Sequence, residues 1–249
     1  MLFMQNIIKY LKCYVLNRCT SKMAHVKMKS TGSSRQVWRN VSATRVVASV
    51  LGAFGGFMAM EHGFLETLQG NIAPSSIIID AVGHQANSVF QGSEPALTLI
   101  PNFLLTGILT MIISLIVIVW ATAFIQRKNG VVFLILFSTI LFLVGGGLAP
   151  LIIFIISCAI ATRINKPLTF WRGHLSGTAG HFLAKLWPYP FLVVFLPSLI
   201  NLQNAIFGNF FGASIPNFSA ILFLFIFGLI SLSILSAFAY DILKQDRFA

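Results

Sequence analysis

Four polar residues at the end of an apolar run have the types and spacing to do chemistry. The run ends in Glu61, His62, Glu66 and Gln69, which open the only acidic region of any size in the chain. On a helix, His62, Glu66 and Gln69 stand at i, i+4 and i+7 and share one face. Glu61 lies about 100° away, on a different face. Because ionisable groups at membrane depth are costly and mark functional sites, we expect an ion or proton site here, with Glu94 as a further candidate.

The same region offers ligands for a metal ion. His62 and Glu66 are four residues apart, and Asp80 and His84 repeat that spacing. Imidazole nitrogen and carboxylate oxygen one helical turn apart can bind a borderline metal such as Zn, Mn or Fe when other ligands converge. Gly83 weakens any helix between Asp80 and His84. The sequence does not identify a metal, and an ordinary polar helix end is the structural alternative to either kind of site.

Motifs for covalent or phosphate chemistry are absent from the sequence. The serines lack a Gly-x-Ser-x-Gly context. The glycine triplet Gly145-Gly146-Gly147 has neither the preceding strand nor the following Lys-Ser/Thr of a phosphate loop. We therefore assign no catalytic residue and no cofactor, and the sequence disfavours an enzyme without excluding one.

The composition is that of an integral membrane protein. Of 249 residues, 57% are apolar and 9% are charged, whereas an ordinary soluble domain carries about 25% charge. The apolar residues form runs long enough to cross a bilayer, which predicts an all-α polytopic transmembrane bundle. The net charge of +11 does not indicate a nucleic-acid partner here, because basic residues mark the cytoplasmic loops of membrane proteins.

The first membrane helix is expected to begin near Ala43 and to lie centrally in the bundle. Ala48, Gly52 and Gly56 recur every four residues. One face of the helix is therefore almost without side chains, and a neighbouring helix can approach it closely. Because a crossing takes about 20 residues, the polar residues described above fall at the outer boundary of the membrane.

The distribution of charge predicts six crossings with both termini in the cytoplasm. Residues 131–162 carry no charge, and this stretch is too long for one crossing and short for two. The glycine triplet near its middle indicates a hairpin of two short helices. With this hairpin, all 17 Lys and Arg fall on the cytoplasmic side, as the positive-inside rule requires. The other crossings are expected at about residues 43–65, 99–125, 188–207 and 218–240.

The remaining segments are expected to lie at the two membrane surfaces. Residues 1–42 are basic and acid-free, and form a cytoplasmic tail suited to anionic lipids. Residues 43–249 form the transmembrane domain. Its external loop at 70–98 has a mixed composition that favours a packed cap. A cytoplasmic segment at 163–187 is rich in aromatic residues and is expected at headgroup level. Its candidate ligands for lipid headgroups are Arg172 and Lys185.

Several motifs cluster within residues 43–190. They are Gly55-Gly56, Met60-Glu61-His62-Gly63 with Glu66, Gln69-Gly70-Asn71, the stretch from Glu94-Pro95 to Pro101-Asn102, and Leu143-Val144-Gly145-Gly146-Gly147. In these motifs the chain resembles a group of uncharacterised prokaryotic multi-pass membrane proteins. The resemblance leaves out the basic tail. It implies a bacterial or archaeal plasma membrane, and it implies no activity.

Three functions stay open on these observations. The leading hypothesis is a small membrane protein of transport or channel type, or a subunit of a larger membrane complex, with an ion or proton site at the outer end of the first helix. The second is a membrane-embedded enzyme with an external metal site built from His62, Glu66, Asp80, His84 and Glu94. The third is a non-catalytic assembly or sensing protein whose external cap binds a partner.

Overall fold

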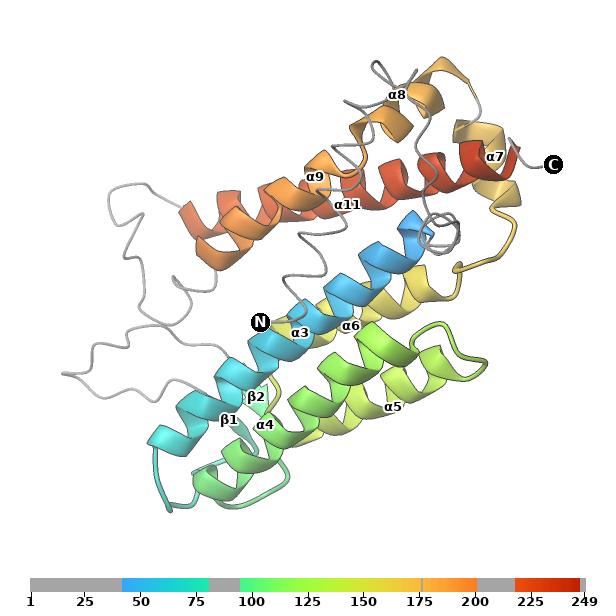
Figure 1. The fold of residues 1–249 in the computed structure, drawn as a ribbon. Helices are drawn as coiled ribbons and strands as arrows, with labels where there is room; N and C mark the ends of the chain where they lie inside the picture. Colours follow the sequence, from blue (N-terminus) through green and yellow to red (C-terminus); the bar gives the residue numbers. More distant parts are fainter. Residues whose placement is uncertain (1–41, 81–94, 176, 201–217, 247–249) are drawn as a thin grey trace, which may run out of the picture. The chain divides into compact units, whose positions relative to one another are not determined.

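The computed structural model describes residues 42–80, 95–175, 177–200 and 218–246. The chain divides into two units, Met1–Val41 and Ser42–Ala249. The predicted basic tail therefore lies outside the described residues, apart from Ser42. Within the second unit, the described part is mostly helical, as the composition predicts. Figure 1 shows its elements in chain order.

Helix α3 (Ala43–Leu68) packs against several other helices. Its start is set by Ser42, whose hydroxyl accepts a hydrogen bond from the Arg45 amide at 3.3 Å, as N-cap residues do. The helix contacts α4, α6 and α11. Most of its residues are buried, including polar ones near both ends. This burial on several sides agrees with the central position expected for the first membrane helix.

Helix α4 (Phe103–Val119) continues without interruption as a short π-helix, η1 (Trp120–Phe124). It begins a few residues later than the sequence indicated because Asn102 caps it, accepting a hydrogen bond from the Leu105 amide at 3.0 Å. The loop after α3 is tied to this start, since the Leu104 amide donates to the Gly70 carbonyl at 3.1 Å. The C-terminal end of α3 and the N-terminal end of α4 are thereby joined.

The long uncharged stretch breaks at the glycine triplet into two helices, as predicted. Helix α5 (Gly130–Leu143) and helix α6 (Leu148–Ala161) have 14 residues each and pack against each other. The linker between them is residues 144–147. Two of its glycines have positive φ, +112° at Gly145 and +77° at Gly147. Residues other than glycine rarely adopt such values. The linker conformation therefore depends on glycine.

A two-stranded antiparallel ribbon was not expected from the sequence. Strands β1 (Ile78–Asp80) and β2 (Pro95–Leu97) pair with Ile79 opposite Ala96. The inward residues Ile79 and Ala96 pack with Phe103 at the start of α4. The all-α expectation is thus incomplete, and the missed signal is the run of β-branched residues 77–79. The residues between the strands, 81–94, lie outside the described part.

The last part of the chain packs along one long helix. Helix α11 (Phe218–Asp246) contacts α7 (Thr169–Leu175), α8 (Thr178–Leu186) and α9 (Tyr189–Val193). The ring of Trp171 lies 5.4 Å from that of Phe238 between centroids. The predicted cytoplasmic segment 163–187 therefore contains two short helices, and both pack on α11.

Three helices in the described residues are long and apolar enough to cross a membrane: α3, α4 with η1, and Leu224–Asp246 of α11. A fourth crossing is formed if Thr178–Leu186 and Tyr189–Ile200, which meet at a bend of 42°, are counted as one. Helices α5 and α6 are apolar but shorter. The chain is accordingly a helical protein of membrane type.

Candidate ion or proton site

Two ionisable side chains are buried in the C-terminal part of α3. The exposed fractions of His62 and Glu66 are 3% and 0%. They are one helical turn apart, so both side chains face the same neighbouring elements. Glu61 is half-buried on a different side of the helix. The structure thus separates the pair His62 and Glu66 from Glu61.

The burial depends on a close crossing of α3 and α4. A Cβ at Gly107 of α4 would collide with the carbonyl oxygen of Gly63 and with Thr67 on α3. In the other direction, a Cβ at Gly63 would lie 2.8 Å from the Gly107 carbonyl oxygen and 2.9 Å from the Cβ of Thr110. Two glycines therefore bring the backbones together beside Glu66, and α4 covers this face of α3.

The α5–α6 linker covers the two ionisable side chains. A Cβ at Gly145 would lie 2.5 Å from Oε1 and 2.7 Å from Oε2 of Glu66. A Cβ at Gly147 would lie 2.6 Å from Cε1 and 2.8 Å from Nε2 of His62. Each glycine leaves the space that one ionisable group fills. The glycine triplet is therefore part of the site, whereas the sequence predicted only the break of a helical hairpin there.

Hydrogen bonds hold the linker in this position. The Leu99 amide donates to the Leu143 carbonyl at 3.0 Å, and Thr98 pairs with Val144 as an isolated bridge. The hydroxyl of Thr110 on α4 donates to the Val144 carbonyl at 2.6 Å. The linker is thus bound on one side by the chain that follows β2 and on the other by α4.

Two buried threonines form a further side of the site around Glu66. The hydroxyls of Thr98 and Thr106 are 3.0 Å apart and hydrogen-bonded, and both side chains are buried. The Thr106 hydroxyl also reaches the Ile100 carbonyl at 3.3 Å. Its methyl carbon Cγ2 lies 2.7 Å from the point that a Gly145 Cβ would occupy, and the Glu66 carboxylate oxygens lie 2.5 and 2.7 Å from the same point. Thr106 therefore turns its methyl group toward this point, and its hydroxyl is used elsewhere.

The carboxylate of Glu66 is buried without a hydrogen bond. Among the described residues, neither Oε1 nor Oε2 has a hydrogen-bond partner, and the side chain is 0% exposed. Burying a polar group without such a partner costs about 1–3 kcal/mol, and an isolated charge costs far more. A proton or another ligand that neutralises the carboxylate would remove most of this cost.

The other predicted site residues have different positions. Gln69 is partly exposed, and its amide donates to the backbone carbonyl of Asp80 at 3.1 Å. It therefore links α3 to strand β1. Asp80 is partly exposed at the end of that strand. His84 and Glu94 lie outside the described residues. Within the part of the chain that the structure describes, no three His, Cys, Asp or Glu side chains come together as metal ligands.

The predicted packing face of α3, formed by Ala48, Gly52 and Gly56, lies in close contacts between helices. The Ala48 carbonyl accepts a hydrogen bond from Ser157 of α6 at 2.7 Å. A Cβ at Gly52 would lie 2.8 Å from the Cβ of Ala121 in η1. A Cβ at Gly56 would lie 2.6 Å from Cγ1 of Ile118 in α4. The small face of α3 thus packs against two neighbours, α6 and α4 with η1.

The two candidate headgroup ligands lie on the short helices that pack on α11. Arg172 forms an ion pair with Asp246 at 3.0 Å and donates to the Gln245 side chain at 3.4 Å. It therefore contacts the end of α11, which the sequence did not indicate. Lys185 lies exposed in the last turn of α8.

The sequence did not indicate two further sets of residues that shape this part of the structure. The first set is three threonines that line the site or hold its linker, Thr98, Thr106 and Thr110. In the sequence they are visible only as hydroxyl side chains inside or beside apolar runs. Asp241 of α11 was missed as well. Its carboxylate accepts hydrogen bonds from the Ala43 and Thr44 amides, each at 2.9 Å. It therefore holds the first turn of α3, far from the site.

Comparison with protein-family models, with curated proteins and with solved structures finds no match to this chain. The geometry of the site therefore carries the functional conclusion.

Proposed function

We propose that this chain is a multi-pass membrane protein of transport or channel type in which Glu66 binds and releases a proton. The observation that carries the proposal is the Glu66 carboxyl group, which is 0% exposed and has no hydrogen-bond partner for either oxygen among the described residues. A protein keeps such a costly group in its interior where function needs it. His62, one turn away and also buried, is the second proton-binding group of the site.

The surroundings of Glu66 favour a proton over a metal ion. A metal ion needs several oxygen, nitrogen or sulfur ligands around it. The Glu66 carboxylate oxygens and the methyl carbon of Thr106 instead lie 2.5–2.7 Å from the point that a Cβ of Gly145 would occupy. Within the described residues no set of three metal-ligating side chains exists. A proton needs no further ligands, so it fits this environment.

The short helices α5 and α6 support a position of Glu66 below the membrane surface. Helix α5 begins at Gly130, next to the exposed basic turn at 127–128, and has 14 residues. It rises about 21 Å at 1.5 Å per residue, whereas the hydrocarbon core is about 30 Å thick. If the basic turn lies at the inner boundary, the linker and Glu66 lie several ångströms inside the outer one.

Exposed apolar residues at the same level support this depth. Phe64 and Leu68 on α3 are 52% and 58% exposed, and Ile78 on β1 is 67% exposed. Large apolar side chains are stable in contact with lipid and unfavourable in contact with water. Their presence around the outer end of α3 fits a site still surrounded by hydrocarbon.

The proposed topology has six crossings with both termini in the cytoplasm, in the plasma membrane of a prokaryotic cell. Pairing α5 and α6 as a hairpin supplies two crossings beyond the four formed by the longer segments. This arrangement keeps all 17 Lys and Arg on one side, as the positive-inside rule requires. The proposed cellular location rests on the motifs around Glu66, His62 and the glycine triplet, which resemble those of a group of prokaryotic multi-pass membrane proteins.

Proton flux into liposomes tests the proposed function. The full-length chain is reconstituted with a pH-sensitive dye trapped inside, and a potassium diffusion potential drives protons across the membrane. We expect flux above that of protein-free liposomes, and we expect Glu66→Gln to reduce it to the protein-free level. Asp246→Asn is the matched control, because it removes one carboxylate from a pair that is exposed at the end of α11.

Equal flux in the original chain and in Glu66→Gln would contradict the proposal, provided that both elute as folded protein in size-exclusion chromatography. Absence of any flux above protein-free liposomes would contradict the transport function as well.

A further inference from the structure

The two short helices α7 and α8 each pack one face on α11. On α7, Leu175 is buried, and the ring of Trp171 lies 5.4 Å from that of Phe238 on α11. On α8, the buried residues are Gly180 and Ala184. Both helices contact α11. Each helix therefore has a second face, which is directed away from α11.

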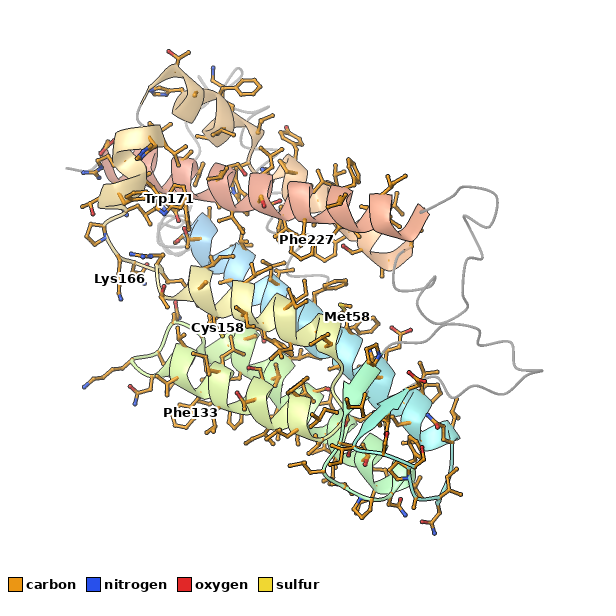
Figure 2. The ribbon with its side chains drawn as sticks, turned by 180° about the vertical axis from the view of Figure 1, so that it is seen from behind. Met58, Phe133, Cys158, Lys166, Trp171 and Phe227 are labelled. Carbon is orange, nitrogen blue, oxygen red and sulfur yellow. The ribbon has the colours of Figure 1, made fainter. Side chains whose placement is uncertain are left out.

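The two helices meet closely. A Cβ at Gly180 of α8 would collide with the carbonyl oxygen of Leu175, the last residue of α7. The glycine thus lets the end of α7 approach the first turn of α8. Figure 2 labels Lys166, which precedes α7, and Trp171, which lies against α11. We treat the faces of α7 and α8 that are directed away from α11 as one surface.

This surface carries an exposed phenylalanine on each helix. Phe170 on α7 is 69% exposed, and Phe182 on α8 is 62% exposed. At about 100° per residue, Phe182 lies about 160° around the helix from the buried Ala184. Large apolar side chains are unfavourable in water, and aromatic rings on amphipathic helices are stable where headgroups meet acyl chains. The two rings therefore favour a membrane boundary as their surroundings.

The same part of the chain is rich in positive charge. Residues 163–187 contain four Lys and Arg and no Asp or Glu, and all four cations are exposed. Arg172 pairs with Asp246 of α11. The other three form no ion pair within the described residues; they are Arg163, Lys166 and Lys185. Lys185 is three residues from Phe182, on the same side of α8. Apolar anchors and unpaired cations thus occur together.

The position of α7 along α11 matches a membrane boundary. The stretch Leu224–Asp246 of α11 is long and apolar enough to cross a membrane, and the ends of such a stretch lie near the headgroups. The ion pair of Arg172 with Asp246 holds α7 at one of these ends. A phospholipid at this level offers its phosphate to the cations and its acyl chains to the phenylalanines.

We propose that α7 and α8 form a docking surface for anionic phospholipids, with Phe170 and Phe182 against the acyl chains and with Lys166 and Lys185 paired with the phosphate groups. Cations near a membrane surface attract negatively charged lipids. Arg172, which the sequence indicated as a headgroup ligand, is already paired with Asp246. An acidic soluble partner would match the charge but not the two exposed rings. This role is independent of proton binding at Glu66.

Competition between two lipids tests the charge preference. The full-length chain is purified in a mild detergent and incubated with equal amounts of phosphatidylglycerol and phosphatidylcholine that carry the same acyl chains. Bound lipids are counted by mass spectrometry of the intact protein. We expect phosphatidylglycerol to be enriched, and we expect Lys166→Gln combined with Lys185→Gln to lower this enrichment at least about fivefold.

Arg127→Gln combined with Lys128→Gln is the matched control. It removes two exposed cations from the turn before α5, and it should keep the enrichment. The basic tail is present in both double variants, so their difference reports on α7 and α8. Equal enrichment in the two double variants, when both elute as folded protein, would overturn the proposal. Inorganic phosphate that displaces the lipid more than chloride of equal ionic strength would also overturn it, because the surface would then bind a free anion.

Fluorescence quenching tests the position of the exposed rings. Phe182→Trp adds an indole to the exposed face of α8, and the original chain supplies the background emission. In liposomes that contain phosphatidylglycerol, we expect the added emission to be quenched by lipids brominated on their acyl chains and to be protected from iodide in the water. Quenching by iodide without quenching by the brominated lipids would show that this face meets water, which contradicts docking on lipid.

Discussion

The carboxylate of Glu66 occupies the space that a side chain at Gly145 would fill. A Cβ at Gly145 would lie 2.5 Å from Oε1 and 2.7 Å from Oε2 of Glu66, although Glu66 lies on α3 and Gly145 lies in the α5–α6 linker. The glycine has a φ of +112°, so both its conformation and its lack of a side chain suit this position. The carboxyl group and the linker that covers it therefore form one unit.

Gly145→Ala should weaken this unit. The new methyl group would overlap the Glu66 carboxylate, and the positive φ is strained for alanine. We expect a loss of about 2–4 kcal/mol in unfolding free energy, seen as a lower unfolding temperature in detergent. Gly173→Ala is the control, because a Cβ there meets nothing within 4 Å, and it should have little effect. An unchanged unfolding temperature for Gly145→Ala would show that the linker does not cover Glu66 closely.

Glu66→Met should make the protein more stable and less active. The substitution removes two oxygens that have no hydrogen-bond partner among the described residues and keeps a side chain of similar length. We expect a gain of about 1–3 kcal/mol, measured by thermal unfolding, together with loss of proton flux. A clear loss of stability would mean that the carboxylate is bound by structural partners, which contradicts its role as a proton-binding group.

Asp241→Ala should destabilise the contact between α11 and α3. Its carboxylate accepts hydrogen bonds from the Ala43 amide at 2.9 Å, the Thr44 amide at 2.9 Å and the Thr44 hydroxyl at 2.7 Å. Losing a buried, charged cap of this kind should cost about 2–4 kcal/mol. Asp246→Ala on the same helix breaks an exposed ion pair and should cost less than about 1 kcal/mol. Equal unfolding temperatures for the two variants would refute the capping role.

Gly107→Ala tests the close crossing of α3 and α4. A methyl group at this position would meet the Gly63 carbonyl and Thr67, so the helices would have to separate next to Glu66. We expect a loss of about 1–3 kcal/mol and increased reactivity of Glu66 toward a carbodiimide. Gly228→Ala, in α11 with nothing near its Cβ, should leave both properties unchanged. If Gly107→Ala also leaves them unchanged, the crossing does not bury the carboxyl group.

Local patterns were enough to predict several parts of this structure. The helix period placed His62 and Glu66 on one face, and both are buried there. The glycine triplet predicted the break between α5 and α6, because glycine disfavours a continuing helix and allows positive φ. The lack of charge in long runs predicted the membrane helices.

Contacts between distant parts of the chain could not be predicted in this way. The covering of Glu66 by Gly145 joins residues that are far apart in the sequence, and no period or spacing relates them. The cap from Asp241 to Thr44 spans 197 positions. The pairing of β1 with β2 depends on packing against Phe103, which short strands need for stability. These features follow from tertiary packing.

Infrared difference spectroscopy tests the central claim about Glu66 most directly. A protonated carboxylic acid has a carbonyl stretching band that is separate from those of a carboxylate and of a glutamine side chain. In reconstituted protein at neutral pH, we expect this band in the original chain and in Asp246→Asn, and we expect Glu66→Gln to lack it. A band that is absent from the original chain, or that persists unchanged in Glu66→Gln, would contradict proton binding at Glu66.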